Sequence, residues 1–124
     1  IHDLGEAIGG DVPAPQQHAS QAKAEQERRD YAELLTPLPA LLRNELLDLW
    51  EEYEGANTPE ARLAKALDKL ETILQHNQGR NPPDFDYRFN LEYGRQYTED
   101  DPIIVEIRRI LDRETARHAR QADA

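Results

Sequence analysis

The first eleven residues carry the polar side chains best suited to chemistry. They read IHDLGEAIGGD and place His2 beside Asp3, Glu6 one helical turn later and Asp11 after two glycines. An imidazole nitrogen next to a carboxylate oxygen suits a divalent first-row metal ion, with water in the remaining positions. A carboxylate one turn away can orient or deprotonate that water. The alternative is a surface His-Asp pair with a solvated Glu6.

The element that must position these groups is predicted to be a helix ending at about Ile8. His2 and Glu6 then share a face, because residues four apart on a helix are neighbours. The two glycines should break the helix and leave the backbone free to bring Asp11 back towards that face. The apolar residues of the segment would form a separate stripe at helical spacing: Ile1, Leu4 and Ile8.

HDLGEAIGGD resembles the second motif of the HD-domain metal-dependent phosphohydrolases. It is most similar to the 5'-deoxynucleotidase branch, whose pattern reads HD-x-x-E-x-x-x-x-G-D. A later stretch, LLDLWEEYEGANTPEARLAKALDKLETILQ, resembles the same branch, in which an LW-x-EYE run precedes a helix carrying a lone Asp in a DK-x-E setting. Together the two matches span about the first three fifths of the chain, and the last third matches only loosely, as a helical tail.

The resemblance implies hydrolysis of 5'-deoxynucleoside monophosphates with a divalent metal held by four protein ligands. These are a His on an upstream helix, the His-Asp pair and a distant Asp; His2, Asp3 and Asp68 match the last three. Glu6 is then the candidate to position or deprotonate water, and Asp11 the candidate to protonate the leaving 5'-oxygen. The two roles could be exchanged, and the sequence does not distinguish Mn, Co, Zn and Mg.

The first His of that pattern has no match, because the chain begins at the second motif with Ile rather than Met. We therefore expect this chain to be a piece of a longer protein. The piece would lack N-terminal helices, a substrate-binding arginine and one of the four metal ligands. The remaining histidines, His18, His76 and His118, do not replace the missing ligand by position. His76 is expected to be a solvated residue at a helix end. This segment alone would hold an incomplete site, and its own activity would be impaired.

Composition narrows the class of protein. The formal net charge of −10 argues against binding to a nucleic-acid polymer. It permits a small phosphorylated substrate, because a bound metal inverts the local field. The absence of Cys excludes disulfides and thiolate metal ligands. No apolar run is long enough to span a membrane. These features permit a cytoplasmic protein with no membrane partner, and the resemblance implies a small nucleotide as substrate. We also expect a homodimer.

Ala, Leu, Glu, Gln and Arg dominate the sequence, so the expected fold is all-α: an HD-domain-like bundle of five to six helices forming one domain over 1–124. Ser20 should cap the second helix after an extended, proline-containing loop. Gly55 should end the third helix. Thr58-Pro59 should start the fourth, and Asp101-Pro102 the last. The expected helices cover about 20–35, 38–54, 59–76 and 102 onwards, with a frayed tail from about 115.

The apolar spacing predicts which helix faces are buried. Asp68 lies off its stripe, beside small alanines, and would sit at a helix-helix seam where it needs a donor or a cation. Phe89, Tyr93 and Tyr97 fit one helix face, which we expect to pack on the fourth helix rather than line a pocket. The predicted inward residues are Leu38, Leu42, Leu46, Trp50 and Tyr53; Leu63, Leu67, Leu70 and Leu74; and Ile103, Ile107, Ile110 and Leu111.

Lys23 and Glu27 form an i, i+4 pair where the resembling family also has a Lys and a Glu. Lys23 could bind a substrate phosphate or bridge to Glu27, and the bridge is favoured. Two other functions stay open for the chain: a non-catalytic HD-type metal-binding or interaction domain with a dimer interface on its last helices, and a plain acidic helical scaffold.

Overall fold

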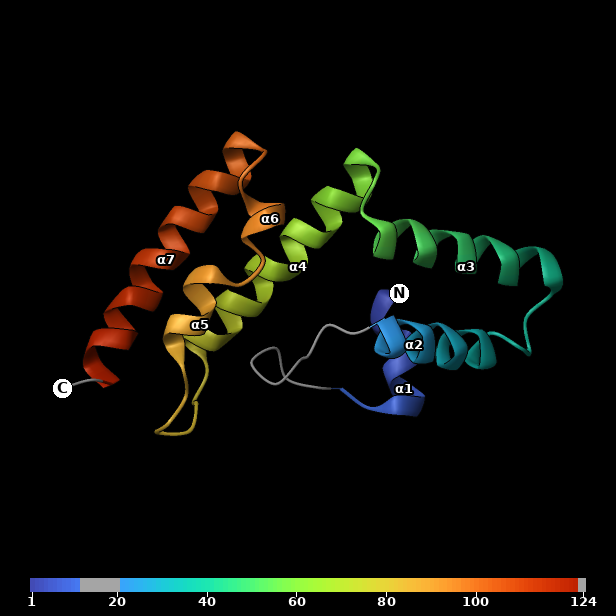
Figure 1. Ribbon diagram of the computed structural model, residues 1–124, viewed down its shortest axis with the longest axis horizontal. Coiled ribbons are helices and arrows are strands. Elements are labelled where there is room, and N and C mark those ends of the chain that lie inside the picture. The colour runs from blue at the N-terminus through green and yellow to red at the C-terminus, as the bar shows by residue number, and fades with distance from the viewer. Residues whose placement is uncertain (12–20, 123–124) are drawn as a thin grey trace. The chain divides into compact units, whose positions relative to one another are not determined.

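The computed structural model describes residues 1–11 and 21–122, and over these ranges it is all-α, as predicted (Figure 1). The described part holds seven α-helices, a 3-10 helix and no strand. The count exceeds five to six because the N-terminal segment and residues 80–100 each form two short helical pieces. The predicted proline loop, the Ser20 cap and His18 lie outside the described residues. No helix in the described ranges is long and apolar enough to cross a membrane.

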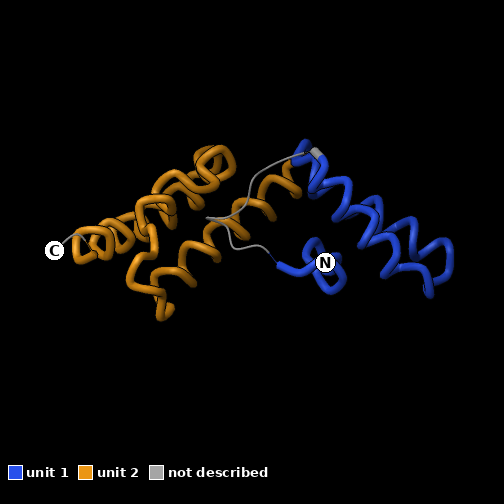
Figure 2. Tube along the Cα trace, turned by 60° about the horizontal axis from the view of Figure 1, so that its bottom comes forward, with its two compact units in different colours: residues 1–57 blue, residues 58–124 orange. Residues whose placement is uncertain are grey.

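The chain divides into two compact units, residues 1–57 and 58–124 (Figure 2). The first contains η1 (His2–Gly5), α1 (Glu6–Gly9), α2 (Gln21–Leu34) and α3 (Ala40–Gly55). The second contains α4 (Pro59–Gln78), α5 (Tyr87–Glu92), α6 (Arg95–Thr98) and α7 (Pro102–Ala122). That all 124 residues form one HD-type domain stays a prediction.

The core of the first unit is an aromatic cluster between α2 and α3. Tyr31, Leu35 and Trp50 are buried, and Leu38, Leu46 and Leu47 pack against them. Gly5 lets η1 approach α2 closely, since a Cβ there would lie 3.1 Å from the Glu27 carbonyl oxygen. The burial of Trp50 in this cluster confirms its predicted packing role.

The predicted N-terminal stripe and one residue of α3 are not buried. Ile1, Leu4 and Ile8 are about half exposed, as is Leu42. The N-terminal segment starts as a 3-10 helix, which has three residues per turn, so the 3.6-residue spacing does not keep these side chains on one face. Gly55 is the last residue of α3, and Ala56 takes the left-handed conformation that follows it, with φ 48°.

Both predicted helix starts in the second unit are confirmed. Thr58 Oγ1 accepts a hydrogen bond from the Ala61 N–H at 3.2 Å. Asp101 Oδ1 accepts from the N–H groups of Ile103 and Ile104 at 2.8 and 3.1 Å. These side chains satisfy amide groups that a helix start otherwise leaves unpaired.

The predicted buried faces of α4 and α7 were largely wrong. Leu70 and Leu111 are buried as expected, but six other predicted inward residues are exposed: Leu63, Leu67, Leu74, Ile103, Ile107 and Ile110. The actual core consists of Ala66, Leu70, Ile73, Ile104 and Leu111, with Tyr93 and Tyr97 packed against it. On α7, the apolar pattern pointed to the wrong face because the buried side also carries Arg108 and Thr115. The polar groups of these two residues are satisfied by hydrogen bonds that periodicity does not reveal.

The C-terminal helix does not fray at about Thr115 but continues to Ala122. Thr115 is fully buried, and its hydroxyl donates to Asn77 Oδ1 on α4 at 3.0 Å. Asn77 in turn donates to the Leu111 carbonyl at 3.3 Å. This buried polar pair joins the two long helices beyond the point where apolar periodicity stops.

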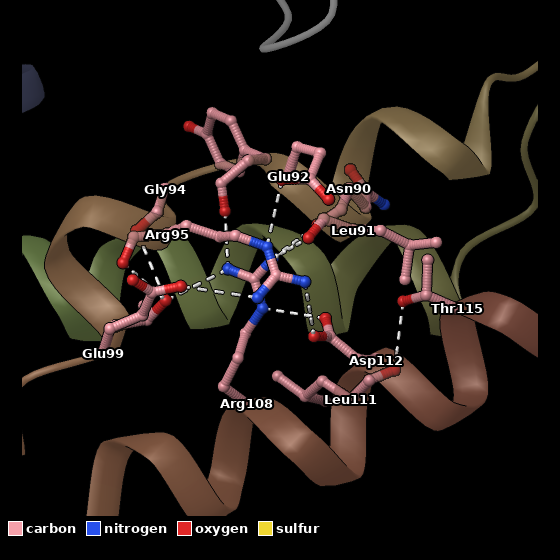
Figure 3. A network of polar contacts seen from close by, with 12 residues as sticks. Asn90, Leu91, Glu92, Gly94, Arg95, Glu99, Arg108, Leu111, Asp112 and Thr115 are labelled. Carbon is pink, nitrogen blue, oxygen red and sulfur yellow. Dashed lines mark hydrogen bonds and ion pairs between the residues drawn. The ribbon is translucent and has the colours of Figure 1, made fainter.

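A buried arginine connects α7 to the segment that carries α5 and α6 (Figure 3). Arg108 is 4% exposed. Its Nε donates to Asp112 Oδ1 at 2.8 Å, and its two Nη atoms donate to acceptors at the end of α5 and on α6. These acceptors are the carbonyls of Asn90, Leu91 and Tyr93 and the hydroxyl of Thr98. The five donors of the guanidinium therefore meet five acceptors.

The sequence predicted that Phe89, Tyr93 and Tyr97 would share one helix face, but residues 80–100 do not form a single helix. Gly94 has φ 68° and separates α5 from α6, so Tyr93 follows the end of α5 whereas Tyr97 lies on α6. Both rings nevertheless pack against the core that α4 contributes to, which confirms their predicted packing role.

Candidate metal centre

His2 and Asp3 lie side by side on η1, as the sequence pattern requires. His2 Nε2 is 3.0 Å from Asp3 Oδ1, and the two side chains are 29% and 64% exposed. An imidazole nitrogen and a carboxylate oxygen are thus presented together at an accessible position. This donor pair fits a divalent ion that takes mixed nitrogen and oxygen ligands.

The imidazole of His2 is fixed by α3. The ring of Tyr53 stacks on it, with centroids 4.2 Å apart and planes at 23°. Trp50 Nε1 donates to the His2 carbonyl at 3.3 Å. The sequence predicts a packing role for Tyr53, and the group it packs against is the candidate ligand His2. The spacing of the two segments along the chain gave no sign of this stack.

Glu6 begins α1, one turn after His2. Partial burial, together with the negative charges of Asp3, Asp11 and Glu27, raises the pKa of Glu6 above its ordinary value of 4.5, and Lys23 opposes this effect. A carboxyl group with a raised pKa holds a proton more readily than an ordinary one. Its environment therefore suits proton transfer better than that of a fully solvated glutamate.

Asp11 follows the glycine pair and is exposed. Gly10 ends α1 with φ 81°, a conformation that favours glycine, so the chain turns here as predicted. Asp11 lies near enough to Glu6 for its charge to contribute to the raised pKa of that residue.

Lys23 bridges to Glu27 with Nζ and Oε1 3.2 Å apart, the favoured of the two sequence alternatives. Both side chains are about one third exposed. The bridge leaves substrate binding by Lys23 as a prediction.

Asp68 lies on α4 and has the cationic partner that the sequence led us to expect. Its Oδ2 accepts from Lys69 Nζ at 2.9 Å, and the same Nζ donates to the Tyr93 hydroxyl at 3.1 Å. Burial alone would lower the pKa of Lys69, but its hydrogen bonds to Asp68 and Tyr93 raise the pKa on balance. Sequence reasoning missed Lys69 and Tyr93 as partners, although Lys69 is adjacent to Asp68 in the DK-x-E stretch.

His76 and His118 have packing environments of their own. His76 Nδ1 lies 3.1 Å from Asn90 Oδ1, and its ring packs edge-on against Phe85, so the expectation of a solvated histidine was wrong. The ring of His118 stacks on Tyr87. Neither observation makes these residues replacements for the missing ligand.

A family model described as the HD domain matches residues 1–108. The chain belongs to the HD domain family. This confirms the resemblance drawn from the two motifs, and HD domains in general bind divalent metal ions. No solved structure is a significant match to the chain.

The chain is also similar to several proteins named 5'-deoxynucleotidase. It is 43% identical to 5'-deoxynucleotidase HDDC2 of Danio rerio over 79 residues, which cover 63% of this chain and 39% of that protein. For the protein of the same name from Homo sapiens the identity is 37% over 78 residues, 63% of this chain and 38% of the relative. For 5'-deoxynucleotidase hdd1 of Schizosaccharomyces pombe the identity is 37% over 82 residues, which cover 60% of this chain and 40% of that protein. The matched region thus spans about two fifths of the length of these relatives.

Proposed function

We propose that this chain is part of a metal-dependent 5'-deoxynucleotidase that hydrolyses 5'-deoxynucleoside monophosphates. The observation that carries the proposal is the His2–Asp3 donor pair with Glu6 one turn away, in a chain of the HD domain family. The names of the relatives support the substrate class.

His2, Asp3 and Asp68 are the proposed metal ligands. For Asp68 the support is the family motif, and for His2 and Asp3 it is also their shared position on η1. A divalent ion bound there would lower the pKa of a bound water and polarise a phosphoryl oxygen. Mn, Co, Zn and Mg are all compatible with these donors.

Hydrolysis requires a proton to leave the attacking water and a proton to reach the 5'-oxygen as its bond to phosphorus breaks. We assign these tasks to Glu6 and Asp11, with Glu6 as the preferred base because of its raised pKa. Lys23 is a candidate to contact the phosphate when its bridge to Glu27 opens. The products are inorganic phosphate and a deoxynucleoside.

Phosphate release from 5'-deoxynucleoside monophosphates, with and without added Mn²⁺ or Co²⁺, tests the proposal on a protein that includes the upstream residues of the HD domain. We expect metal-dependent release that Asp68→Asn and Glu6→Gln each reduce by a factor of about 100 or more. The matched control is Asp84→Asn, which changes an exposed acid on a loop. Metal-dependent turnover that survives both site substitutions would refute the assignment.

We also propose a cytoplasmic homodimer with no membrane or nucleic-acid partner. The exposed isoleucines of α7, Ile103, Ile107 and Ile110, support an interface on this helix, because they recur at helical spacing. Light scattering of the chain and of Ile107→Glu tests this. Conversion of a dimer to a monomer is expected, and a monomeric parent chain would contradict it.

A further inference from the structure

The side chain of Asp68 is held by a lysine that is itself held on two sides. Lys69 Nζ bonds to both Asp68 Oδ2 and the Tyr93 hydroxyl and lies 5.1 Å from the centroid of the Tyr93 ring. The side chains of Asp68 and Lys69 are only 24% and 19% exposed. An ion pair with this burial and a third fixed partner keeps its geometry better than a solvated surface pair does.

The backbone at Gly94 is shaped to let Lys69 take this path. A Cβ on Gly94 would lie 2.5 Å from Lys69 Cγ and 2.6 Å from Lys69 Cβ. Carbon atoms that are not bonded to each other clash at these distances. The stem of the lysine therefore lies directly against the turn between α5 and α6. Gly94 also has φ 68°, so glycine is favoured here on two independent grounds.

The turn that carries Tyr93 and Gly94 is anchored to α7 by Arg108. The Tyr93 carbonyl accepts from Arg108 Nη1 at 2.6 Å, and the guanidinium also binds the end of α5 (Figure 3). The backbone of Tyr93 is thus anchored by a buried, fully paired cation. A continuous series of contacts leads from Arg108 through Tyr93 and Lys69 to the Asp68 carboxylate.

We propose that Lys69 and Tyr93 are positioning residues, which hold the Asp68 carboxylate in one orientation so that it is ready to bind a divalent cation. The consequence for metal binding rests on the proposed function, whereas the orientation itself does not. The alternative is that Lys69 only neutralises Asp68, in which case the carboxylate orientation would not depend on the Tyr93 hydroxyl.

The first test measures the orientation of Asp68 without metal. In the isotopically labelled full chain, the two three-bond Hα–Hβ couplings of Asp68 should show a single χ1 rotamer. Lys69→Met should bring the two couplings towards a common averaged value, and Tyr93→Phe should do so in part. The control is Lys65→Met, one turn earlier on α4, where the lysine lies 5.7 Å from the Tyr97 ring centroid. Averaged couplings in the parent chain, or unchanged couplings in Lys69→Met, would overturn the proposal.

The second test measures Mn²⁺ binding by the full chain and uses Tyr93→Phe, because this change keeps the charge of Lys69. We expect the dissociation constant to rise roughly tenfold, the size typical of losing a residue that orients a ligand. Tyr97→Phe, which alters the other tyrosine packed on the same core, should change it less than twofold.

Asp68→Asn separates failure of the inference from failure of the proposed function. If this variant binds Mn²⁺ as tightly as the parent chain, Asp68 is not a ligand, and the couplings alone decide whether Lys69 and Tyr93 orient it. If Asp68→Asn weakens binding and Tyr93→Phe does not, the positioning role in metal binding is wrong.

Discussion

The phenol ring of Tyr53 stacks on the imidazole of His2 at a centroid distance of 4.2 Å. This contact, together with the hydrogen bond from Trp50 to the His2 carbonyl, ties an exposed 3-10 turn to α3. Without these contacts, a candidate metal ligand on so short an element would be free to change its ring orientation. The stack therefore explains how so short an element can present an ordered imidazole.

Replacing Tyr53 with Leu should weaken Mn²⁺ binding by the chain several-fold, because the His2 ring loses the surface that fixes its plane. Isothermal titration calorimetry measures the change. Tyr87→Leu is the matched control, since Tyr87 stacks on His118 with centroids 5.0 Å apart. Equal loss of affinity in the two variants would show that the effect does not come from the His2 stack.

The charge of Glu6 should make folding of the metal-free chain depend on pH. Because the pKa of Glu6 is raised in the folded state, protonation of this group favours folding. That contribution is complete below the unfolded value of about 4.5 and is lost as pH rises through the folded pKa. At pH 7 the ionised Glu6 therefore destabilises the fold.

Glu6→Gln should accordingly raise the free energy of unfolding at pH 7, and the gain should disappear as the pH is lowered below 4.5. Urea denaturation in the presence of a chelator measures both values. A gain of the same size at both pH values would indicate an effect of side-chain size or packing rather than of charge.

Local features of this chain were predicted from the sequence better than the packing of its helices. The His2–Asp3 pair, the position of Glu6 and the Thr58 cap each depend on residues close together in sequence. Their arrangement could therefore be predicted from spacing alone. The leucines of α4 were assigned to the wrong face because a run rich in Leu and Ala offers more than one apolar stripe. Only the approach of α7, which places Ala66 and Ile73 in the core, selects between them.

Contacts between residues distant in sequence were not accessible to the same reasoning. Nothing in the local pattern around Arg108 shows that its guanidinium meets three backbone carbonyls from another segment. The stack of Tyr53 on His2 joins positions fifty-one residues apart and has no sequence signature. Such pairings follow from tertiary structure and not from spacing.

Arg108→Met should lower the free energy of unfolding by about 3 kcal/mol, because several buried acceptors lose their donor at once. Thermal and urea denaturation of the chain measure the loss. The neighbouring Arg109→Met removes an arginine that pairs on the surface with Glu106 and should leave the midpoint nearly unchanged. A small effect at Arg108 would mean that the acceptors find other partners, including water.

The two glycines with positive φ offer a final comparison. Gly10 has φ 81° and no atom within 4 Å of an added Cβ, whereas Gly94 has φ 68° and Lys69 Cγ at 2.5 Å. Gly94 has the left-handed conformation (φ 68°, ψ 13°), in which alanine costs about 1 kcal/mol. Gly10 (φ 81°, ψ 161°) lies outside the left-handed region, in a conformation essentially restricted to glycine that costs another residue about 1–3 kcal/mol. Only Gly94→Ala must also displace the lysine or shift the turn between α5 and α6.

Both variants should therefore destabilise the chain, but only Gly94→Ala should change the Asp68 couplings, because it alone moves Lys69 off the carboxylate. Urea denaturation and the NMR couplings of Asp68 give the two measurements on the same samples. If neither variant alters the Asp68 couplings, the close approach of Gly94 to Lys69 has no role in holding the carboxylate. If Gly94→Ala changes the couplings while retaining the α-helical circular dichroism of the parent, the turn between α5 and α6 acts on Asp68 through Lys69 rather than through unfolding.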